Sequence, residues 1–317
     1  MSEVSPEQRL WELMHGAFAT RALGIVADLR IADALAGGPR PVTELAGETG
    51  TSADSLQRIL RALASDGVFA ELSPGVFRNT EASELLRVAA TRDFAHLYGG
   101  AWHRAAGELD AGMGTVAFER AFGTGFWSWL AAHPEERASF DRAMVDGLER
   151  RVERLAALEW RGDETVVDVG GGNGSLLVAL LARRPGLRGI VFDLPETVRD
   201  ESSLGDGIEF VAGSFFESVP AGDVYVLSTV LHNWPDEQAA AILHTIRAAA
   251  PEHGRLLVID AVMPAGNEPD GRHWFALLGL SLFGSHERDE AQWLALFDGT
   301  GFEPLQLRDG LIEARCR

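Results

Sequence analysis

The chain contains no lysine, so all 28 of its basic residues are arginines, against 47 aspartates and glutamates. The formal net charge of −19 at pH 7 argues against nucleic acid or an anionic membrane as a partner, because phosphate groups repel a negative surface. Cys316 is the only cysteine, which excludes a disulfide within the chain and gives no sign of an oxidising compartment. The amino terminus has no basic segment followed by an apolar run, and the longest apolar stretch, residues 275–283, is too short to span a bilayer. We therefore expect a soluble, cytoplasmic protein.

Glycine is abundant, and its densest cluster follows a β-branched run. Residues 165–169 predict a buried strand, and Gly170, Gly172 and Gly174 then lead into an apolar helix. Glycines at these positions permit a tight turn and let a ligand lie against bare backbone. The spacing differs from that of the dinucleotide-binding fingerprint, whose last glycine comes three residues after the second. With Asp168 two residues before the first glycine, the loop favours a cationic ligand without a pyrophosphate, such as S-adenosylmethionine. An ordinary strand–loop–helix turn is the alternative.

The segments that follow alternate between strands and helices, which predicts a mainly parallel sheet with its ligands at the carboxyl ends of the strands. Asp193 ends the second strand, where a carboxylate in such sheets accepts hydrogen bonds from ribose hydroxyls. Taken alone, an acid before Pro195 is better explained as a strand end or a helix cap, and it is the glycine loop that favours the ribose role. Further strands are expected over residues 208–212, 223–228 and 255–260, with a helix over residues 236–250.

The amino-terminal residues predict helices and a hairpin in the order of a winged helix. A winged helix is usually associated with DNA, so a transcription regulator is one interpretation of the chain. The helix that would read DNA carries Asp54 beside Arg58 and Arg61, whereas DNA binding needs a concentrated basic face. We therefore expect this module to serve dimerisation, with the apolar first helices as the interface. The predicted elements are helices over residues 8–35, 41–48 and 52–65, the last capped by Ser52, and a hairpin over residues 68–78.

Residues 94–155 are rich in aromatic side chains, and glycines divide this segment into short helical pieces. Aromatic residues at helical spacing usually belong to a core, here one between domains. A minority of these rings could instead line a pocket for a flat acceptor, because rings allow offset stacking. The segment therefore predicts both core and part of a substrate site.

Six short motifs occur along the chain in a fixed order. They are Phe140-Asp-Arg-Ala-Met144, Asp168-Val-Gly-Gly-Gly-Asn-Gly174, Phe192-Asp-Leu-Pro195, Gly213-Ser-Phe-Phe216, Leu231-His-Asn-Trp234 with Asp236-Glu237, and Gly284-Ser-His-Glu-Arg288 followed by Trp293 and Thr300-Gly-Phe302. This order resembles that of the S-adenosylmethionine-dependent O-methyltransferases that include plant caffeate-type and bacterial polyketide-tailoring enzymes of antibiotic biosynthesis. The resemblance implies an α/β protein with a winged-helix dimerisation domain over residues 1–93. A class I methyltransferase domain with a Rossmann-like sheet would follow over residues 94–317, with residues 94–155 as its helical linker and substrate segment.

Carried over by position, the resemblance implies three sets of site residues. The general base falls on His232, flanked by the acids Asp260 and Glu287. The cofactor-binding set is Asp168, Gly170, Gly172, Gly174, Asp193, Leu194, Ser214, Phe215 and Ser228, with Ser214 and Phe215 flanking adenine. The substrate-binding set is Trp102, Phe140, Met144, Leu278 and Leu282. The chain departs from the family at four positions. Relatives often have Asp at the positions of Ser214 and Ala276, Lys at that of Ser228, and an acid at that of Asn233. The departure at Ser214 would weaken a hydrogen bond to adenine, and that at Ala276 would allow an unusual acceptor.

His232 suits methyl transfer from a sulfonium, which needs a deprotonated or partly deprotonated nucleophile. A phenol has a pKa of about 10 and is mostly protonated at neutral pH, so a base with a pKa of about 7 helps. Acids at Asp260 and Glu287 would orient the ring and stabilise its imidazolium form. The plainer alternatives are a histidine hydrogen-bonded to backbone, a polar strand end at Asp260 and a solvated helix-start acid at Glu287.

Three functions remain open at this point. O-methylation of a phenolic or polyketide-like hydroxyl is favoured, on a small aromatic acceptor and by a homodimer. N-methylation, or a decarboxylase- or hydroxylase-like role without methyl transfer, is the alternative on the same fold. A cofactor-sensing regulator that uses the winged helix is the third. The nine histidines lack metal-ligand spacing, so no metal is expected, in contrast to the small Mg²⁺-dependent catechol-type methyltransferases.

Overall fold

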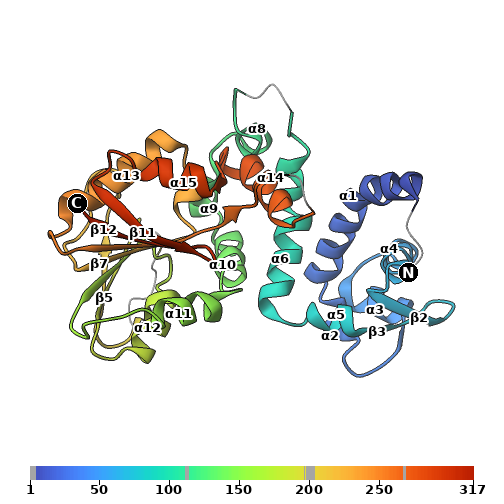
Figure 1. Cartoon of the computed structure of the whole chain (residues 1–317). Helices are drawn as coiled ribbons and strands as arrows, with labels where there is room; N and C mark the ends of the chain where they lie inside the picture. The colour runs from blue at the N-terminus through green and yellow to red at the C-terminus, as the bar shows by residue number, and fades with distance from the viewer. Residues whose placement is uncertain (1–4, 111–113, 196, 198–203, 267–268) are drawn as a thin grey trace. The chain divides into compact units, whose positions relative to one another are not determined.

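The computed structural model describes residues 5–110, 114–195, 197, 204–266 and 269–317. The chain divides into two compact units (Figure 1). Unit 1 comprises the described residues up to Gly107 together with His133–Asp146, and unit 2 comprises Glu108–Ala132 and Gly147–Arg317. The aromatic segment after residue 93 thus contributes to both units. The domain boundary at residue 93 stays a prediction.

Unit 1 is mainly helical and contains the predicted winged-helix elements. Ser52 caps α4 by accepting a hydrogen bond from the Ser55 N–H at 3.4 Å, and β2 and β3 pair antiparallel as the expected hairpin. Helices α1 and α6 cross in backbone contact, since a Cβ on Gly24 would lie 2.8 Å from Gly99 Cα. The elements are α1 (Pro6–Asp28), α2 (Ile31–Ala34), β1 (Arg40–Pro41), α3 (Val42–Thr49), α4 (Ala53–Ser65), β2 (Phe69–Ser73), β3 (Val76–Asn79), α5 (Glu81–Leu85), α6 (Ala89–Gly99), α7 (Ala101–Ala106) and α10 (Pro134–Ala143).

Unit 2 is built on a seven-stranded sheet with the strand order β11-β12-β8-β7-β4-β5-β6. The five strands from β8 to β6 in this order pair in parallel, which confirms the α/β fold class and the mainly parallel sheet. The chain passes outward from β4 to β5 and β6 and then returns to β7 on the other side of β4. The topological switch point therefore lies between β4 and β7, where ligands of such sheets bind at the carboxyl ends.

Helices cover both faces of this sheet, as Figure 1 shows for α13 and α15 on one side and α11 and α12 on the other. Alternate strand residues enter the two cores: Val167 and Tyr225 lie in one cluster, and Val166 and Val224 in the other. The elements are α8 (Ala117–Phe122), α9 (Phe126–Ala132), α11 (Leu148–Ala156), β4 (Thr165–Val169), α12 (Ser175–Arg183), β5 (Arg188–Asp193), β6 (Ile208–Ala212), β7 (Val224–Ser228), η2 (Leu231–Asn233), α13 (Asp236–Ala249), β8 (Arg255–Ile259), β9 (Val262–Met263), α14 (Arg272–Phe283), β10 (Arg288–Asp289), α15 (Glu290–Phe297), β11 (Phe302–Arg308) and β12 (Leu311–Cys316).

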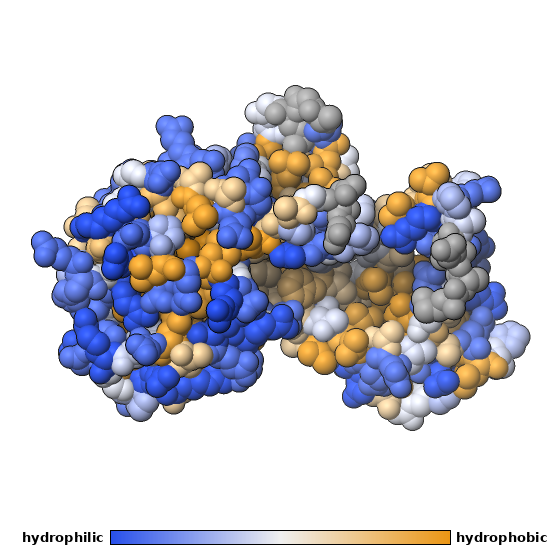
Figure 2. Space-filling model, viewed as in Figure 1, coloured by the Kyte–Doolittle hydropathy of each residue, from blue (hydrophilic) through white to orange (hydrophobic). Residues whose placement is uncertain are grey.

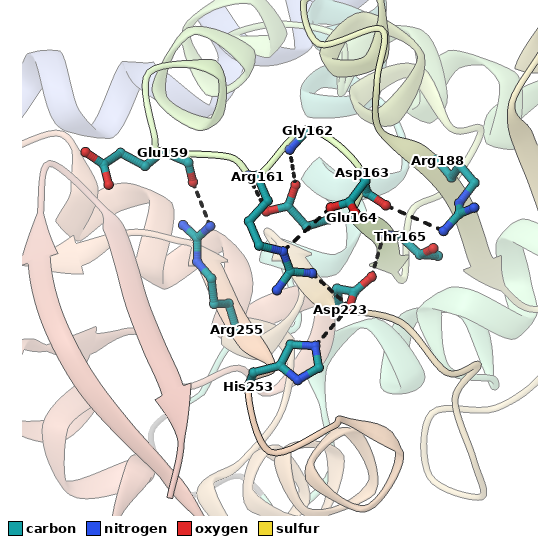
Figure 3. Close-up of polar contacts among 10 residues, drawn as sticks. All are labelled: Glu159, Arg161, Gly162, Asp163, Glu164, Thr165, Arg188, Asp223, His253 and Arg255. Atoms are coloured by element: carbon teal, nitrogen blue, oxygen red, sulfur yellow. Dashed lines mark hydrogen bonds and ion pairs between the residues drawn. The ribbon is translucent and has the colours of Figure 1, made fainter.

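The amino ends of the central strands are closed by a polar network (Figure 3). Asp223 accepts hydrogen bonds from the Thr165 N–H at 2.9 Å and the Arg161 guanidinium at 3.1 Å, and lies 3.2 Å from His253 Nε2. The two carboxylate oxygens of Glu164 each accept a backbone N–H at 2.8 Å. None of the buried side-chain atoms that lack a hydrogen-bond partner in the described part of the chain belongs to this network. This edge is therefore satisfied by its own contacts, and the opposite edge is the place to look for a ligand site.

Within the described ranges, no helix is both long enough and apolar enough to cross a membrane.

Candidate active site

The loop after β4 turns sharply at its glycines. Gly170, Gly172 and Gly174 have φ values of +73°, +60° and +78°, which L side chains rarely adopt. A Cβ would also lie 2.9 Å from Val230 Cγ2 at the first of these positions and 2.4 Å from Leu204 Cδ2 at the last. The turn therefore requires glycine, and it leaves bare backbone at the carboxyl end of the strand next to the switch point.

Gly171 is a fourth position in this loop that requires glycine, although it is not one of the alternating glycines of the motif. A Cβ there would lie 2.8 Å from Asp168 Cγ, so the loop backbone rests directly on the Asp168 carboxyl. Asp168 is 2% exposed, and its Oδ2 is buried without a hydrogen-bond partner. Burial and the nearby charge of Asp193 raise the pKa of Asp168 to about 7, while Arg151 opposes the shift. An unpartnered buried carboxylate oxygen is costly, and it suits a cationic or donating group placed in the loop.

Asp193 ties the end of β5 to the glycine loop. Its Oδ2 accepts the Gly172 N–H at 2.8 Å, and its Oδ1 accepts the Leu194 N–H at 2.7 Å and the Thr197 hydroxyl at 2.9 Å. A carboxylate has about four acceptor positions, so one remains for a ribose hydroxyl.

Aromatic side chains stand beside the same loop. Phe215 packs edge-on against Phe216 and Trp234, with ring centroids 5.0 and 5.8 Å away, and lies 3.8 Å from where a Cβ on Gly170 would be. Ser214 accepts the Phe216 N–H at 3.3 Å, so its hydroxyl is engaged locally. The remaining predicted cofactor residues are exposed or half-buried at strand ends, Leu194 after β5 and Ser228 at the end of β7.

His232 lies in η2, directly after β7, and is buried with an exposure of 7%. Its Nδ1 is 2.7 Å from Glu287 Oε1 and 3.5 Å from Asp260 Oδ1, and its backbone N–H donates to Asp260 Oδ2 at 3.2 Å. Asp260 follows β8, the strand beside β7, and Glu287 precedes β10. The fold thus brings the three predicted catalytic residues together and directs Nδ1 to the carboxylates, which leaves Nε2 to act on an acceptor.

The carboxylates change the protonation of His232. Burial alone lowers the pKa of His232, but the charges of Asp260 and Glu287, the Glu287 hydrogen bond and the Thr229 carbonyl outweigh it and raise the pKa to about 9. Burial and Glu287 raise the pKa of Asp260, and His232 opposes that shift. The expectation of a base titrating near neutrality therefore differs from the structure. The acids were expected to stabilise the imidazolium form, and in this buried site their combined charge raises the pKa of His232 beyond neutrality.

Two features that sequence reasoning missed hold the turn around His232. Arg288 is completely buried and donates to the carbonyls of Leu231 at 3.0 Å and Trp234 at 2.8 Å, on either side of the histidine. Thr229 has φ +56°, a strained conformation for a β-branched residue, and its carbonyl contributes to the histidine's environment. Arg288 is part of one of the six motifs, so the sequence could have indicated it. Nothing in the sequence indicates the strained backbone at Thr229.

Helix α14 forms one side of the His232 site. Phe275 stacks on the imidazole with centroids 5.9 Å apart and planes at 14°. Gly279 lets the Ser285–Glu287 segment approach, because a Cβ there would lie 2.3 Å from Ser285 Oγ and 3.7 Å from Glu287 Oε1. Neither residue was among the predicted site residues.

The predicted substrate residues fall in different units. Leu278 and Leu282 lie on α14 in unit 2, the former half-buried and the latter almost completely buried. Trp102, Phe140 and Met144 belong to unit 1, so their contact with an acceptor near His232 stays a prediction. Trp102 is buried edge-on to Tyr98, with centroids 5.0 Å apart, and its Nε1 has no hydrogen-bond partner.

His232, Asp260 and Glu287 are also the one group within the described residues whose donor atoms are close enough to share a metal ion, all within 4.8 Å. The 2.7 Å contact from Nδ1 to Glu287 is a hydrogen bond that already accounts for this proximity. The absence of a metal requirement stays a prediction.

Comparison with known proteins decides the family. A profile described as an O-methyltransferase domain matches residues 102–303, and one described as an O-methyltransferase dimerisation domain matches residues 11–89. The chain belongs to the S-adenosylmethionine-dependent O-methyltransferases. A phenazine O-methyltransferase of Lysobacter antibioticus is 39% identical to this O-methyltransferase over 92% of the chain and 90% of that relative.

Two solved structures extend the comparison. An O-methyltransferase from neocarzinostatin biosynthesis, in complex with S-adenosylmethionine and 2-hydroxy-5-methyl naphthoic acid, is 35% identical. It matches with a TM-score of 0.83 over 94% of this chain and 96% of that one. An N,N-dimethyltransferase of 8-amino-8-demethyl-D-riboflavin from Streptomyces davawensis is 28% identical, with a TM-score of 0.77 over 99% of this chain and 100% of that one.

Proposed function

We propose that the protein transfers the methyl group of S-adenosylmethionine to a phenolic hydroxyl of an aromatic, polyketide-type metabolite, with His232 as the general base. The observation that carries the proposal is the contact of His232 Nδ1 with Glu287 at 2.7 Å, reinforced by Asp260 at 3.5 Å. Two carboxylates on one nitrogen fix the ring and stabilise its protonated form, which is what a base needs after it has taken a proton.

The cofactor, when bound, supplies a methyl group on a positively charged sulfur. The glycine loop offers backbone at Gly170–Gly174, Asp193 offers an acceptor position to ribose, and Phe215 offers an aromatic face beside the loop. His232 Nε2 takes the proton of the acceptor hydroxyl as the oxygen gains the methyl group. Phe275, stacked on the imidazole, supplies an apolar face to the same site.

The relatives support an aromatic acceptor, since one is a phenazine O-methyltransferase and another is bound to a naphthoic acid. Because one solved relative is an N,N-dimethyltransferase, methylation of a nitrogen is the second candidate function. The two candidates differ in their need for a base, because an uncharged amine is a nucleophile without losing a proton first, whereas a phenol is not.

Methyl-labelled S-adenosylmethionine, incubated in EDTA with the protein and a panel of phenolic and aminophenolic acceptors, tests the proposal. We expect label on a phenolic oxygen with the wild type. His232→Ala should bind the cofactor normally but lose about 10²–10⁴ in kcat at neutral pH, the usual contribution of a positioned base. Label on nitrogen with full His232→Ala activity would establish the second candidate. Activity restored only by Mg²⁺ would show that the His232 group holds a metal.

We also propose that the protein is a homodimer assembled through residues 1–93. Between residues 10 and 18, α1 exposes large apolar side chains, among them Leu10 at 62% and Phe18 at 78%, and Figure 2 shows apolar surface along this helix. The arginines of α4 are paired within unit 1, Arg58 with Asp54 at 3.0 Å and Arg61 with Glu71 at 2.8 Å, so they do not form a basic face for DNA.

A further inference from the structure

A cavity of about 930 Å³ lies in unit 2 outside the methyl-transfer site. Of the His232 group only Asp260 is among the described residues that line it, and the glycine loop takes no part in that lining. The volume lies within the range of pockets that bind small molecules, about 300–1,000 Å³. The proposed function leaves this cavity without an occupant.

Much of the cavity wall is apolar. The segment after β8, helix α15 and strand β11 contribute to it, with the side chains of Val262, Met263, Pro264, Leu294 and Leu307. Leu294 is 44% exposed, so a large apolar side chain at the cavity keeps much of its surface uncovered. A ligand with an apolar body would remove this surface from water, which favours binding.

Arg154 of α11 supplies a polar group to the same cavity. Its side chain is half-buried, and Nη1 lies 3.6 Å from where a Cβ on Gly310 would be, at the turn between β11 and β12. Within the described part of the chain, Arg154 has no hydrogen bond or ion pair. A guanidinium presents five N–H donors in a planar fork that matches a carboxylate with two parallel bonds. Arg154 therefore provides an unused group for binding a carboxylate.

The other charged side chains around the cavity are already engaged or face solvent. Arg272 is held by Asp270, with 2.7 Å between Nη2 and Oδ2. Asp289 caps α15 by accepting a backbone N–H at 2.8 Å. Glu290 and Asp309 are exposed, so water and salt screen their negative charges.

A second cavity, of about 630 Å³ at the amino edge of the sheet, gives an internal comparison. It also contains arginines, but the protein itself occupies them (Figure 3). Arg161 donates to Asp223 at 3.1 Å, and Arg255 donates to the Glu159 carbonyl at 2.8 Å. Arg154 differs from both, because it lines a cavity and meets no anion of the described chain there.

We propose that the cavity at Arg154 is a second ligand site, which binds a small apolar carboxylate. The carboxylate accepts two N–H bonds from the guanidinium, and the apolar body covers Leu294 and the segment after β8. The site goes beyond the proposed function and does not depend on it, because its ligand contacts neither His232 nor the glycine loop.

Calorimetric titration of the full-length, cofactor-free protein with 6-bromo-2-naphthoate tests the site. This acid has no hydroxyl group and cannot be methylated on a phenolic oxygen. We expect it to bind with a Kd of about 1 mM or below, as its number of non-hydrogen atoms allows. The matching alcohol, (6-bromonaphthalen-2-yl)methanol, should bind at least about tenfold more weakly, because it lacks the charge-assisted bonds.

Two arginine variants assign the binding to the cavity. Arg154→Gln should weaken binding of the naphthoate by about 10–100-fold. Its Tm should equal that of the wild type, since the substitution removes no printed contact between described residues. Arg150→Gln is the matched control, exposed on the same helix and outside the described lining, and should bind as the wild type does. Leu294→Asp should also weaken binding, by taking away part of the apolar wall.

Equal affinity of the wild type and Arg154→Gln would overturn the inference, as would equal affinity for the acid and the alcohol. Preference for 2-naphthylmethylamine over the acid would overturn it too, because the acidic side chains would then determine the charge of the ligand.

Crystals soaked with 6-bromo-2-naphthoate locate the ligand through the anomalous scattering of bromine. A peak between Arg154 and Leu294 would support the inference, whereas a peak only beside His232 would overturn it. Failure of the wild type to methylate any acceptor would count against the proposed function and leave this inference unaffected.

Discussion

At the scale of single residues, the His232 site depends on close approaches that permit little change. Glu287 reaches His232 Nδ1 at 2.7 Å only because α14 has a glycine where its neighbours pass. The same helix supplies Phe275, which stacks on the imidazole ring. The position of His232 therefore depends in part on Gly279, a residue without a side chain that could take part in the reaction.

Gly279→Ala should disturb this geometry. The added methyl group would lie 2.3 Å from Ser285 Oγ and push away the segment that holds Glu287. We expect kcat to fall by about 10–100-fold, as misplacement of a catalytic group by about 1 Å can do, with an unchanged Kd for the cofactor. Gly271→Ala is the matched control, because nothing lies within 4 Å of its Cβ position at the start of the same helix. A Gly279→Ala enzyme with the kcat of the control would contradict this role.

At the scale of elements, the parallel strands follow from sequence because each is a short β-branched run ending at a turn residue. The glycine loop and the Ser52 cap could also be predicted, because each is determined by residues adjacent in the sequence. The antiparallel strands β11 and β12 were not predicted, since their runs are interrupted by Pro304 and by alternating charges. The approach of His232 to Asp260 and Glu287 joins residues 28 and 55 positions apart, which no spacing rule connects, so only the family resemblance indicated it.

Histidine 96 links three helices of unit 1. Nδ1 of His96 on α6 lies 2.6 Å from Asp28 of α1, and its Nε2 lies 3.1 Å from Glu136 of α10. Hydrogen bonds to Asp28 and Glu136 prevail over burial and raise the pKa of His96 to about 10. Because this pKa is raised on folding, the stabilisation is complete below pH ~6.5 and is lost as the pH rises through about 10.

His96→Gln should therefore lower the Tm most at pH 6, by the equivalent of about 2 kcal/mol, and by less at each higher pH up to 10. Thermal melts of wild type and variant across this range measure the difference. His244→Gln, on the exposed face of α13, serves as the control and should give no such trend. A constant difference across pH would mean that the charge on His96 does not support the helices.

At the scale of the whole molecule, the two units carry different surface chemistry. Of the five unpartnered buried polar atoms in the described part of unit 2, Asp168 Oδ2, Asn233 Oδ1 and Glu287 Oε2 lie at the carboxyl edge of the sheet, while the amino edge is closed by the Asp223 network. Unit 1 instead exposes apolar side chains on α1. The first pattern suits a ligand, and the second suits a protein partner.

Light scattering at micromolar concentration should give about 68 kDa, twice the 34.2 kDa of one chain. Replacing Leu10 and Phe18 together by aspartate should shift the mass toward the monomer, since both side chains are exposed and contribute no buried core. Val145→Asp, exposed in unit 1 outside α1, should leave the dimer intact. A wild-type mass of one chain would refute the dimer.

The pH dependence of kcat/KM with a phenolic acceptor, for wild type and His232→Ala, tests the central claim most directly. A base that must be unprotonated, with a pKa of about 9 in the free protein, predicts that the wild-type value rises between pH 7 and pH 9. His232→Ala should lie about 10²–10⁴ lower at pH 7, and the gap should narrow as the acceptor ionises near its own pKa of about 10. Glu287→Gln should show a smaller version of the same defect. A His232→Ala enzyme that keeps most of its activity at neutral pH would contradict the account and make His232 a structural residue.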